Sequence, residues 1–227
     1  MKSAGSEETL VDQVVRHIQT EIARDRLRAN EKISENRIAK QLRISRSPIR
    51  EAFRILERDG LIRLVPGKGA HVLEVTPEDA CEIFLLRSYL IGLAVRLATS
   101  ELTSRELWKY RNWIKELKRA AAQSDAGRFL EITSAVEKFF TRQCGSARLK
   151  RFIEMLGNPC LKYRAFLASV PGYMAEVVRF HAGIAGAIEK NNPDRAESLR
   201  REISEKGRQL IFRYFLTHGK NRERRLA

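Results

Sequence analysis

Apolar residues recur at helical spacing in two neighbouring segments near the N-terminus, residues 34–44 and 45–58. Ser34 and Ser45 stand just before the two helical patterns, where the side-chain oxygen of an N-cap accepts a backbone N–H. The second segment has apolar residues at i, i+3, i+4 and i+7, which are Ile49, Ala52, Phe53 and Leu56. This spacing predicts two helices joined by a short turn, the second with one buried face.

A longer amphipathic segment precedes them at about residues 7–27. Its apolar side consists of Leu10, Val14, Ile18 and Ile22. We expect this side to receive Phe53 and Leu56, so that the three helices share one core.

A β-hairpin pattern follows the second helix. The β-rich run Leu61 to Val65 leads into Pro66-Gly67-Lys68-Gly69, a turn sequence, and a second run covers Ala70 to Leu73. The order helix, turn, helix, hairpin predicts a winged helix-turn-helix over residues 1–74. Such a domain inserts its second helix into the major groove of DNA.

Three arginines are spaced four residues apart on the expected second helix: Arg46, Arg50 and Arg54. They fall on a different face from the apolar stripe, where guanidinium groups suit phosphate and guanine contacts. A basic helix face is by itself as often a solvated surface. The preceding helix and the following hairpin favour DNA binding.

The chain after residue 74 shows only helical patterns. Thr76, Pro77 and Asp79 form a helix start, with a cap, a proline at the first position and an acid at the third. The expected helices cover about 77–100, 103–123, 125–143, 147–156, 159–169, 173–190 and 193–216. The chain should therefore be mainly α, with an all-α antiparallel bundle over residues 75–218 and a basic tail at 219–227.

Three pieces of the first domain together resemble the DNA-binding domain of the GntR family of bacterial transcription regulators. They are SRSPIREA at 45–52, LERDGL at 56–61 and PGKGAHV at 66–72, within a match over about residues 9–74. Where the family often has an arginine, this chain has Asn36, with Arg37 one place on. The resemblance implies a set of DNA-contacting residues, with Arg37 taking the displaced position: Arg37, Ser45, Arg46, Ser47, Arg50, Gly67 and Lys68.

The helical half resembles the FCD effector domain of the FadR-like branch, through EIFLLR at 82–87 and FHAGIAGAIE at 180–189. Many members hold a divalent metal with one Asp and three His. Three of those positions align here with Val136, Phe140 and Ile203, and only His181 remains. Because carbon side chains have no lone pairs, we expect no metal and no cofactor.

Arg87 is the family arginine placed near the effector cavity, and we expect it to bind ligand together with His181. Four further residues are candidates for an anion-binding wall, although most such charges lie on surfaces: Arg96, Lys162, Arg164 and Arg179. The expected effector is a small anion, such as a carboxylate or an acyl-CoA-like molecule. The sequence leaves open that the bundle binds nothing.

The charge distribution keeps one alternative function open. The net charge is +15, and residues 1–74 carry 15 Lys and Arg against 11 Asp and Glu, leaving 28 and 17 for the remainder. Most of the excess charge thus lies outside the DNA-binding domain. A non-specific, nucleoid-type nucleic-acid-binding protein is therefore the alternative to a sequence-specific regulator.

The sequence contains no motif or apolar segment that indicates catalysis or membrane insertion. The GxSxG, HExxH, P-loop and GxGxxG motifs are missing, and the chain has 4 His. The N-terminal segment is polar, and no apolar run approaches the roughly 20 residues of a membrane span. We therefore expect a cytoplasmic homodimer, not an enzyme, that binds double-stranded DNA at a palindromic operator.

Overall fold

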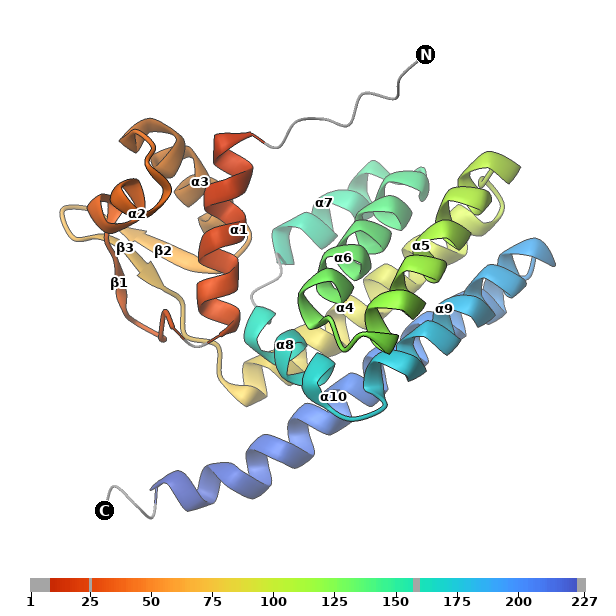
Figure 1. Cartoon of the computed structure of the whole chain (residues 1–227). Coiled ribbons are helices and arrows are strands. Elements are labelled where there is room, and N and C mark those ends of the chain that lie inside the picture. Colours follow the sequence, from red (N-terminus) through yellow and green to blue (C-terminus); the bar gives the residue numbers. More distant parts are fainter. Residues whose placement is uncertain (1–8, 25, 157–159, 224–227) are drawn as a thin grey trace. The chain divides into compact units, whose positions relative to one another are not determined.

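The computed structural model describes residues 9–24, 26–156 and 160–223, and for residues 215–223 the backbone alone (Figure 1). The chain divides into two units. The first contains residues 1–75 and 157–162, and the second contains 76–156 and 163–227. The three cysteines are free and buried.

The first unit has the expected order of three helices and a hairpin, with one additional strand. Strand β3 lies in the centre of an antiparallel sheet with the order β1-β3-β2. This is the winged helix-turn-helix that the sequence predicts. Its elements are α1 (Leu10–Ala23), β1 (Lys32–Ile33), α2 (Glu35–Leu42), α3 (Arg46–Arg58), β2 (Ile62–Val65) and β3 (Gly69–Val72).

Local sequence explains where these helices begin and end. The Ser34 hydroxyl accepts the backbone N–H of Arg37 at 3.2 Å and so caps α2. Arg43 adopts left-handed φ of 55° in the turn between α2 and α3. Helix α3 ends where Gly60 has φ of 71° and the N–H of Leu61 donates to the Leu56 carbonyl at 2.9 Å. That pattern is a Schellman motif, which requires a residue such as glycine after the helix.

The core of the first unit forms where α1 meets the apolar face of α3. Phe53 and Leu56 are buried together with Val14, Ile18 and Ile22 of α1. The expected partner Leu10 is an exception, because half of it is exposed at the first turn of α1. Helix α1 is also shorter than the expected range of about 7–27.

The hairpin alternates between inward and outward side chains. Ile62 pairs with Val72 and Leu64 with Ala70 on the core side, while Arg63 pairs with His71 on the outer side. The wing turn is closed by a hydrogen bond of 3.0 Å from the Lys68 N–H to the Val65 carbonyl. Pro66 and Gly67, the latter with φ of 72°, occupy the positions that a type II turn reserves for proline and glycine.

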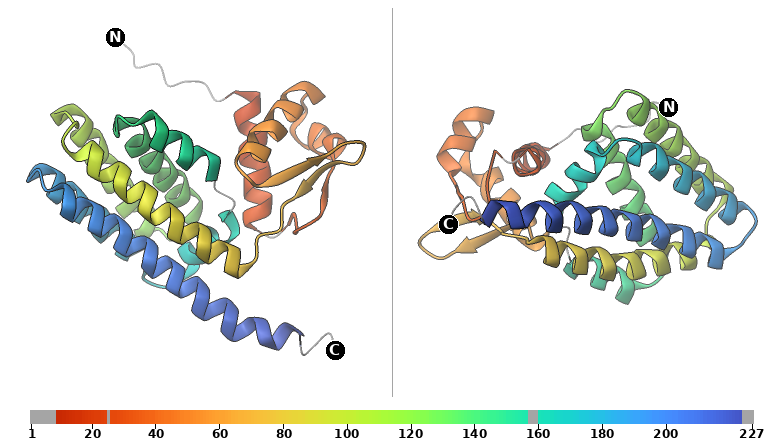
Figure 2. Two further views of the ribbon diagram at one scale, coloured as in Figure 1. Left: turned by 180° about the vertical axis from the view of Figure 1, so that it is seen from behind. Right: turned by 90° about the horizontal axis from the view of Figure 1, so that it is seen from below.

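The second unit is an all-α bundle in the part that the structure describes. Helix α10 runs antiparallel beside α4, and it also packs against α9, which in turn contacts α5 (Figures 1 and 2). The described helices are α4 (Pro77–Thr99), α5 (Ser104–Ala122), α6 (Ala126–Gln143), α7 (Ala147–Leu156), α8 (Leu161–Ser169), α9 (Tyr173–Glu189) and α10 (Pro193–Glu223). Capping boxes at Thr76 and Thr103 start α4 and α5.

Two predictions about boundaries need correction. Helix α10 continues to Glu223, beyond the expected end near residue 216 and into the segment expected to be a basic tail. Strand β1 was not expected, because two residues carry no periodic pattern of their own. The side chains of residues 219–227, the expected basic tail, lie outside the described residues.

Candidate functional site

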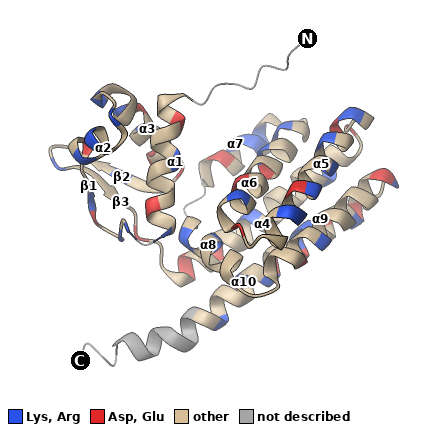
Figure 3. Cartoon of the chain, in the orientation of Figure 1, with Lys and Arg blue, Asp and Glu red and all other residues tan. Residues whose placement is uncertain are grey.

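Helix α3 presents a cationic face on a different side from its buried stripe. Arg46, Arg50 and Arg54 are all exposed, while Ile49 and Phe53 are buried against the core. Figure 3 shows Lys and Arg positions gathered over α2 and α3. The sequence prediction of one inward and one outward face on this helix is confirmed. An exposed helix of this kind can enter the major groove and offer guanidinium groups to base edges and phosphates.

Two of the predicted DNA-contacting arginines are held by carboxylates. The Nε atom of Arg50 lies 3.2 Å from Oε2 of Glu35, at the first position of α2. Arg37 lies 3.8 Å from Oε1 of Glu31. Neither carboxylate is predicted from the sequence. The Arg50–Glu35 pair depends on how α2 and α3 cross, and the Arg37–Glu31 pair depends on how the segment before β1 lies beside α2.

The two predicted phosphate-contacting serines are exposed at the N-terminus of α3. Ser45 occupies the N-cap position, yet its side chain makes no capping hydrogen bond. The first backbone N–H groups of a helix have no intrahelical partner and favour anions, as does the helix dipole. This helix end is therefore chemically suited to a phosphate.

The wing tip carries the remaining predicted DNA contacts. Gly67 and Lys68 are exposed, and a Cβ atom placed on Gly67 would meet nothing within 4 Å. The N–H of Leu64 donates to Oε1 of Glu57 at 2.7 Å, so β2 is fastened to the last turn of α3. Helix α3 and the hairpin are therefore joined directly by a hydrogen bond.

The family's metal-ligand positions form part of an apolar core in the second unit. Val136, Phe140 and Ile203 are buried in the cluster that fills the bundle. His181 is buried as well, and its Nδ1 lies 2.8 Å from the Tyr110 hydroxyl oxygen. Burial, and to a lesser degree the charge of Arg200, lower the pKa of His181 to about 3.

This donor set does not fit a divalent cation. Carbon side chains stand at three of the four positions, and the remaining imidazole already contacts a phenol. Over the described ranges, no three His, Cys, Asp or Glu side chains come together as a metal site would require. The chemistry of this core is that of packed aromatic and aliphatic groups around one neutral histidine.

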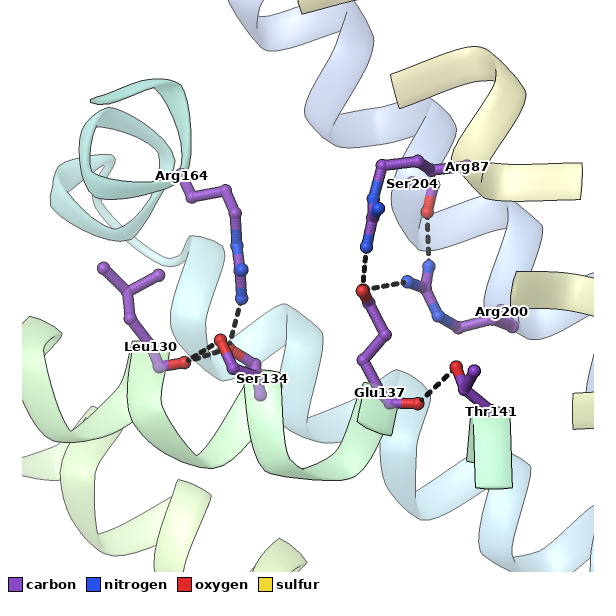
Figure 4. A network of polar contacts seen from close by, with 9 residues as sticks. Arg87, Leu130, Ser134, Glu137, Thr141, Arg164, Arg200 and Ser204 are labelled. Carbon is purple, nitrogen blue, oxygen red and sulfur yellow. Dashed lines mark hydrogen bonds and ion pairs between the residues drawn. The ribbon is translucent and has the colours of Figure 1, made fainter. Parts of the chain in front are cut away.

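A buried ionic network lies in the same bundle (Figure 4). The carboxylate of Glu137 on α6 pairs with Arg87 of α4, and its Oε2 is 3.6 Å from Nη2 of Arg200 on α10. These three side chains are only 12–20% exposed. Arg164 of α8 donates to the Thr133 hydroxyl at 3.0 Å. Glu137 is therefore a mostly buried carboxylate with arginine partners.

The arginines control the ionisation of this network. Burial raises the pKa of the Glu137 carboxyl, but Arg87, Arg164 and Arg200 more than offset this and hold it below its ordinary value. Burial also raises the pKa of Tyr173 to about 12, against the charges of Arg200 and Arg164. Glu137 is therefore an anion at neutral pH inside a cationic enclosure.

The predicted anion-binding residues separate into two groups. Arg87 and Arg164 belong to the electrostatic surroundings of Glu137. Arg96 instead pairs with Asp194 and Glu197, and Arg179 is exposed beside Glu176. Arg200, which acts on both Glu137 and His181, is not predicted from the sequence. The feature of the sequence that could have identified Arg200 is its position three residues before Ile203 on the same helix.

An apolar stripe marks the outer face of α4. Its exposed large residues follow a four-residue spacing: Leu85, Tyr89, Leu93 and Leu97. Beside it, a groove of about 800 Å³ is lined by α4 and α10. The groove wall carries both signs of charge, including Glu202 and Lys206, and the Arg201 guanidinium lies 3.8 Å over the Tyr89 ring.

Comparisons with known proteins match both units. Residues 10–72 match the family described as bacterial regulatory proteins, gntR family, and residues 82–205 match the FCD domain. A probable D-xylose utilization operon transcriptional repressor of Paenarthrobacter nicotinovorans is 30% identical over 190 residues, which cover 83% of each chain. The HTH-type transcriptional repressor RspR of Escherichia coli is 24% identical over 87% of this chain and 89% of its own.

Solved structures show the same fold. McbR/YncC of E. coli matches with a TM-score of 0.76 at 20% identity, covering 91% of this chain and 99% of that one. A GntR transcriptional regulator of Rhodococcus sp. RHA1 matches with a TM-score of 0.68 at 18% identity, covering 90% and 98%. Among the described residues, no helix combines the length and apolar character that crossing a membrane demands.

Proposed function

The chain belongs to the GntR family of bacterial transcription regulators and carries an FCD domain, and from this premise we propose which residues read DNA and what the bundle senses. The observation that carries the proposal is the exposed guanidinium face of α3, which lies roughly 100° around the helix from its buried stripe. A fold match alone assigns no contacts, so the side chains must supply them.

Arg46 and Arg50 contact base edges in the major groove, because they project from the exposed side of the recognition helix. Ser45 and Ser47 contact phosphate at its N-terminus, and Arg37 contacts the backbone from α2. Gly67 and Lys68 at the wing tip approach the minor groove. Two observations support these contacts. All seven residues are exposed, and the Ser45 side chain makes no capping hydrogen bond, so its hydroxyl is available to a phosphate.

Sequence-specific reading is tested by selecting binding sites for the full chain from random duplex DNA. The selected duplex is then compared with an unrelated duplex of equal length at fixed salt. A regulator should prefer its site by a factor on the order of 10³ or more. Equal affinities and a steep salt dependence for both duplexes would instead support the non-specific, nucleoid-type alternative.

A homodimer supplies the second reading head for a palindromic operator. The apolar stripe of α4 and the neighbouring groove are the surface we propose for it, with a second copy as the occupant. Exposed leucines at regular spacing favour burial, and a wall with both signs of charge is self-complementary about a twofold axis. Leu93→Asp should convert dimer to monomer in light scattering, while Trp108→Asp on α5, an apolar residue that is more exposed than Leu93, should not.

The bundle senses a small anion without a metal. Arg87, Arg200 and His181 are the residues that we propose to contact it, in the enclosure that already holds the Glu137 carboxylate. The Glu137 carboxylate is bound by two mostly buried arginines. A ligand carboxylate can bind the same arginines, either beside Glu137 or in its place. The alternative is a purely structural ion network, in which no ligand takes part.

A thermal-shift screen of the full chain separates these two possibilities. Carboxylates, acyl-CoAs and divalent metals are tested singly, since a ligand that binds only the native state raises the melting temperature. We expect an anion to raise it, and the shift to vanish in Arg200→Gln. Failure of every anion would contradict ligand binding. Elemental analysis should find no stoichiometric metal, and one zinc, nickel or manganese ion per chain would contradict the metal-free site.

A further inference from the structure

We propose that the outer face of the wing sheet is a second phosphate-binding site, formed by Lys32, Arg63 and His71. It extends the proposed DNA contacts beyond the recognition helix and the wing tip, and it rests on DNA binding by the first unit. None of the three residues is part of the set inferred from the α3 face or from the turn.

The sheet register brings these residues into one row. His71 on the central strand β3 is opposite Lys32 of β1 on one side and Arg63 of β2 on the other. Directly paired residues in antiparallel strands share a face, with Cβ atoms about 5 Å apart. The neighbouring pairs Ile62–Val72 and Leu64–Ala70 point into the core, so the row lies on the outer face.

The cations of this row are not neutralised by the protein. The ion pairs between described residues of the first unit join Arg26 to Glu21, Arg37 to Glu31, Arg50 to Glu35 and Arg58 to Asp59. Lys32 and Arg63 therefore have no carboxylate partner in the part that the structure describes. The order β1-β3-β2 places the two cations on the outer strands, on either side of His71, where both remain available to an external anion.

His71 adds a polar atom without a partner. Its Nδ1 is buried, and within the described part of the chain it has no hydrogen-bond partner. A buried polar atom that is not hydrogen-bonded weakens folding, and such an atom at a functional surface points to a ligand or to water. The register places His71 between Lys32 and Arg63, so this Nδ1 belongs to the same row as the two cations.

The row continues toward the wing tip. A Cβ atom placed on Gly69 would lie 3.6 Å from Cε of Lys32, so the Lys32 side chain extends along β3 toward the turn that presents Lys68. Two cations, Lys32 and Arg63, thus lie on the outer face of the sheet, and the Lys32 side chain extends toward the turn that presents Lys68. A line of separated cations fits successive phosphates of one DNA strand better than a single small anion, and it carries no base-specific information.

The test is the salt dependence of DNA binding by the full chain carrying Lys32→Gln and Arg63→Gln together. Binding to the selected duplex and to the unrelated duplex is titrated at several salt concentrations. The slope of log K against log salt should become shallower by about 0.9 for each phosphate that the double variant no longer neutralises, equally for both duplexes. The preference for the selected duplex should stay within about twofold of the starting protein.

Two control proteins accompany the double variant. Lys115→Gln with Lys118→Gln removes the same charge from α5 and should leave the slope unchanged. Lys32→Arg with Arg63→Lys keeps the charge and should keep the slope, which excludes a loss of folding as the cause. An unchanged slope in the Lys32→Gln, Arg63→Gln protein, or an equal change in the α5 control, would overturn the proposal.

Failure of the broader proposal has a different signature. If the unsubstituted chain binds both duplexes equally, then sequence-specific reading is wrong. If it prefers the selected duplex while the double variant keeps the full salt slope, then only the sheet-face site is wrong.

Discussion

Arg50 of the recognition helix is joined to Glu35 of the preceding helix through its Nε atom, 3.2 Å from the carboxylate Oε2. The ion pair uses Nε, so it does not require either of the two terminal nitrogens of the guanidinium. Those nitrogens are the ones that a guanine O6 and N7 pair would accept from. The carboxylate thus orients an arginine whose side chain is otherwise two-thirds exposed.

Glu35→Gln should therefore weaken discrimination between the two duplexes while strengthening binding to DNA in general. Removing a negative charge beside the DNA-facing arginines should raise affinity for unrelated duplex severalfold, since non-specific binding is electrostatic. Affinity for the selected site should gain less, because Arg50 loses its orienting partner. Competition titrations at one salt concentration measure both affinities.

Glu82→Gln is the matched control for that prediction. It removes the same charge from an exposed position on α4 and should leave both affinities unchanged. A Glu35→Gln protein with an unaltered ratio of the two affinities would show that the ion pair does not position Arg50.

Phe53 should be a major contributor to the stability of the DNA-binding unit. It is 3% exposed and packs with α1 residues in the unit's core. Phe53→Ala should lower the free energy of unfolding by about 3–5 kcal/mol, as large-to-small core substitutions do. Leu10→Ala, at a half-exposed position, should lower it by less than about 1 kcal/mol. Equal effects in urea titrations would mean that the inward face of α3 is wrongly assigned.

Features determined by neighbouring residues could be predicted from the sequence. The start of α4 follows from the Thr76 capping box and the end of α3 from Gly60, and both signals lie within a few residues of the boundary. The two faces of α3 follow from spacing alone. Strand β1 has no such signal, because its two residues are ordered by pairing with β3 far along the chain.

The sites could be predicted only in part, because contacts between residues far apart in the sequence leave no local signal. The exposed arginines of α3 and the burial of His181 follow from helical position. Their partners do not, since Glu35 and Arg50 are 15 residues apart and Tyr110 and His181 are 71 apart. The ionic network of Glu137 needs α4, α6 and α10 to converge, which no local pattern encodes.

His181 should make the stability of the bundle depend on pH. Burial and Arg200 lower its pKa from 6.5 to about 3, so the folded imidazole stays neutral while the unfolded one is protonated below pH 6.5. Stability is therefore fully present above pH 6.5 and is lost progressively as the pH falls toward 3. Between about pH 7 and 5 this group should remove about 2 kcal/mol.

The measurement compares urea unfolding of the unsubstituted chain and of His181→Gln at about pH 7 and pH 5, the interval over which the unfolded imidazole gains its proton. The variant should fold, although it loses the interaction of Nδ1 with Tyr110. Its stability should fall less between the two pH values. An identical fall in both proteins would indicate that His181 is protonated in the native state.

The most direct test of the account is the effect of Arg46→Ala and Arg50→Ala on binding to the selected duplex and to an unrelated one. Each substitution should weaken binding to the selected duplex by roughly 1–3 kcal/mol and relax the preference at particular base pairs. Lys68→Ala at the wing should instead weaken both duplexes evenly and reduce the salt slope. Unchanged binding of the selected duplex by Arg50→Ala would contradict the assignment of α3 as the helix that reads DNA.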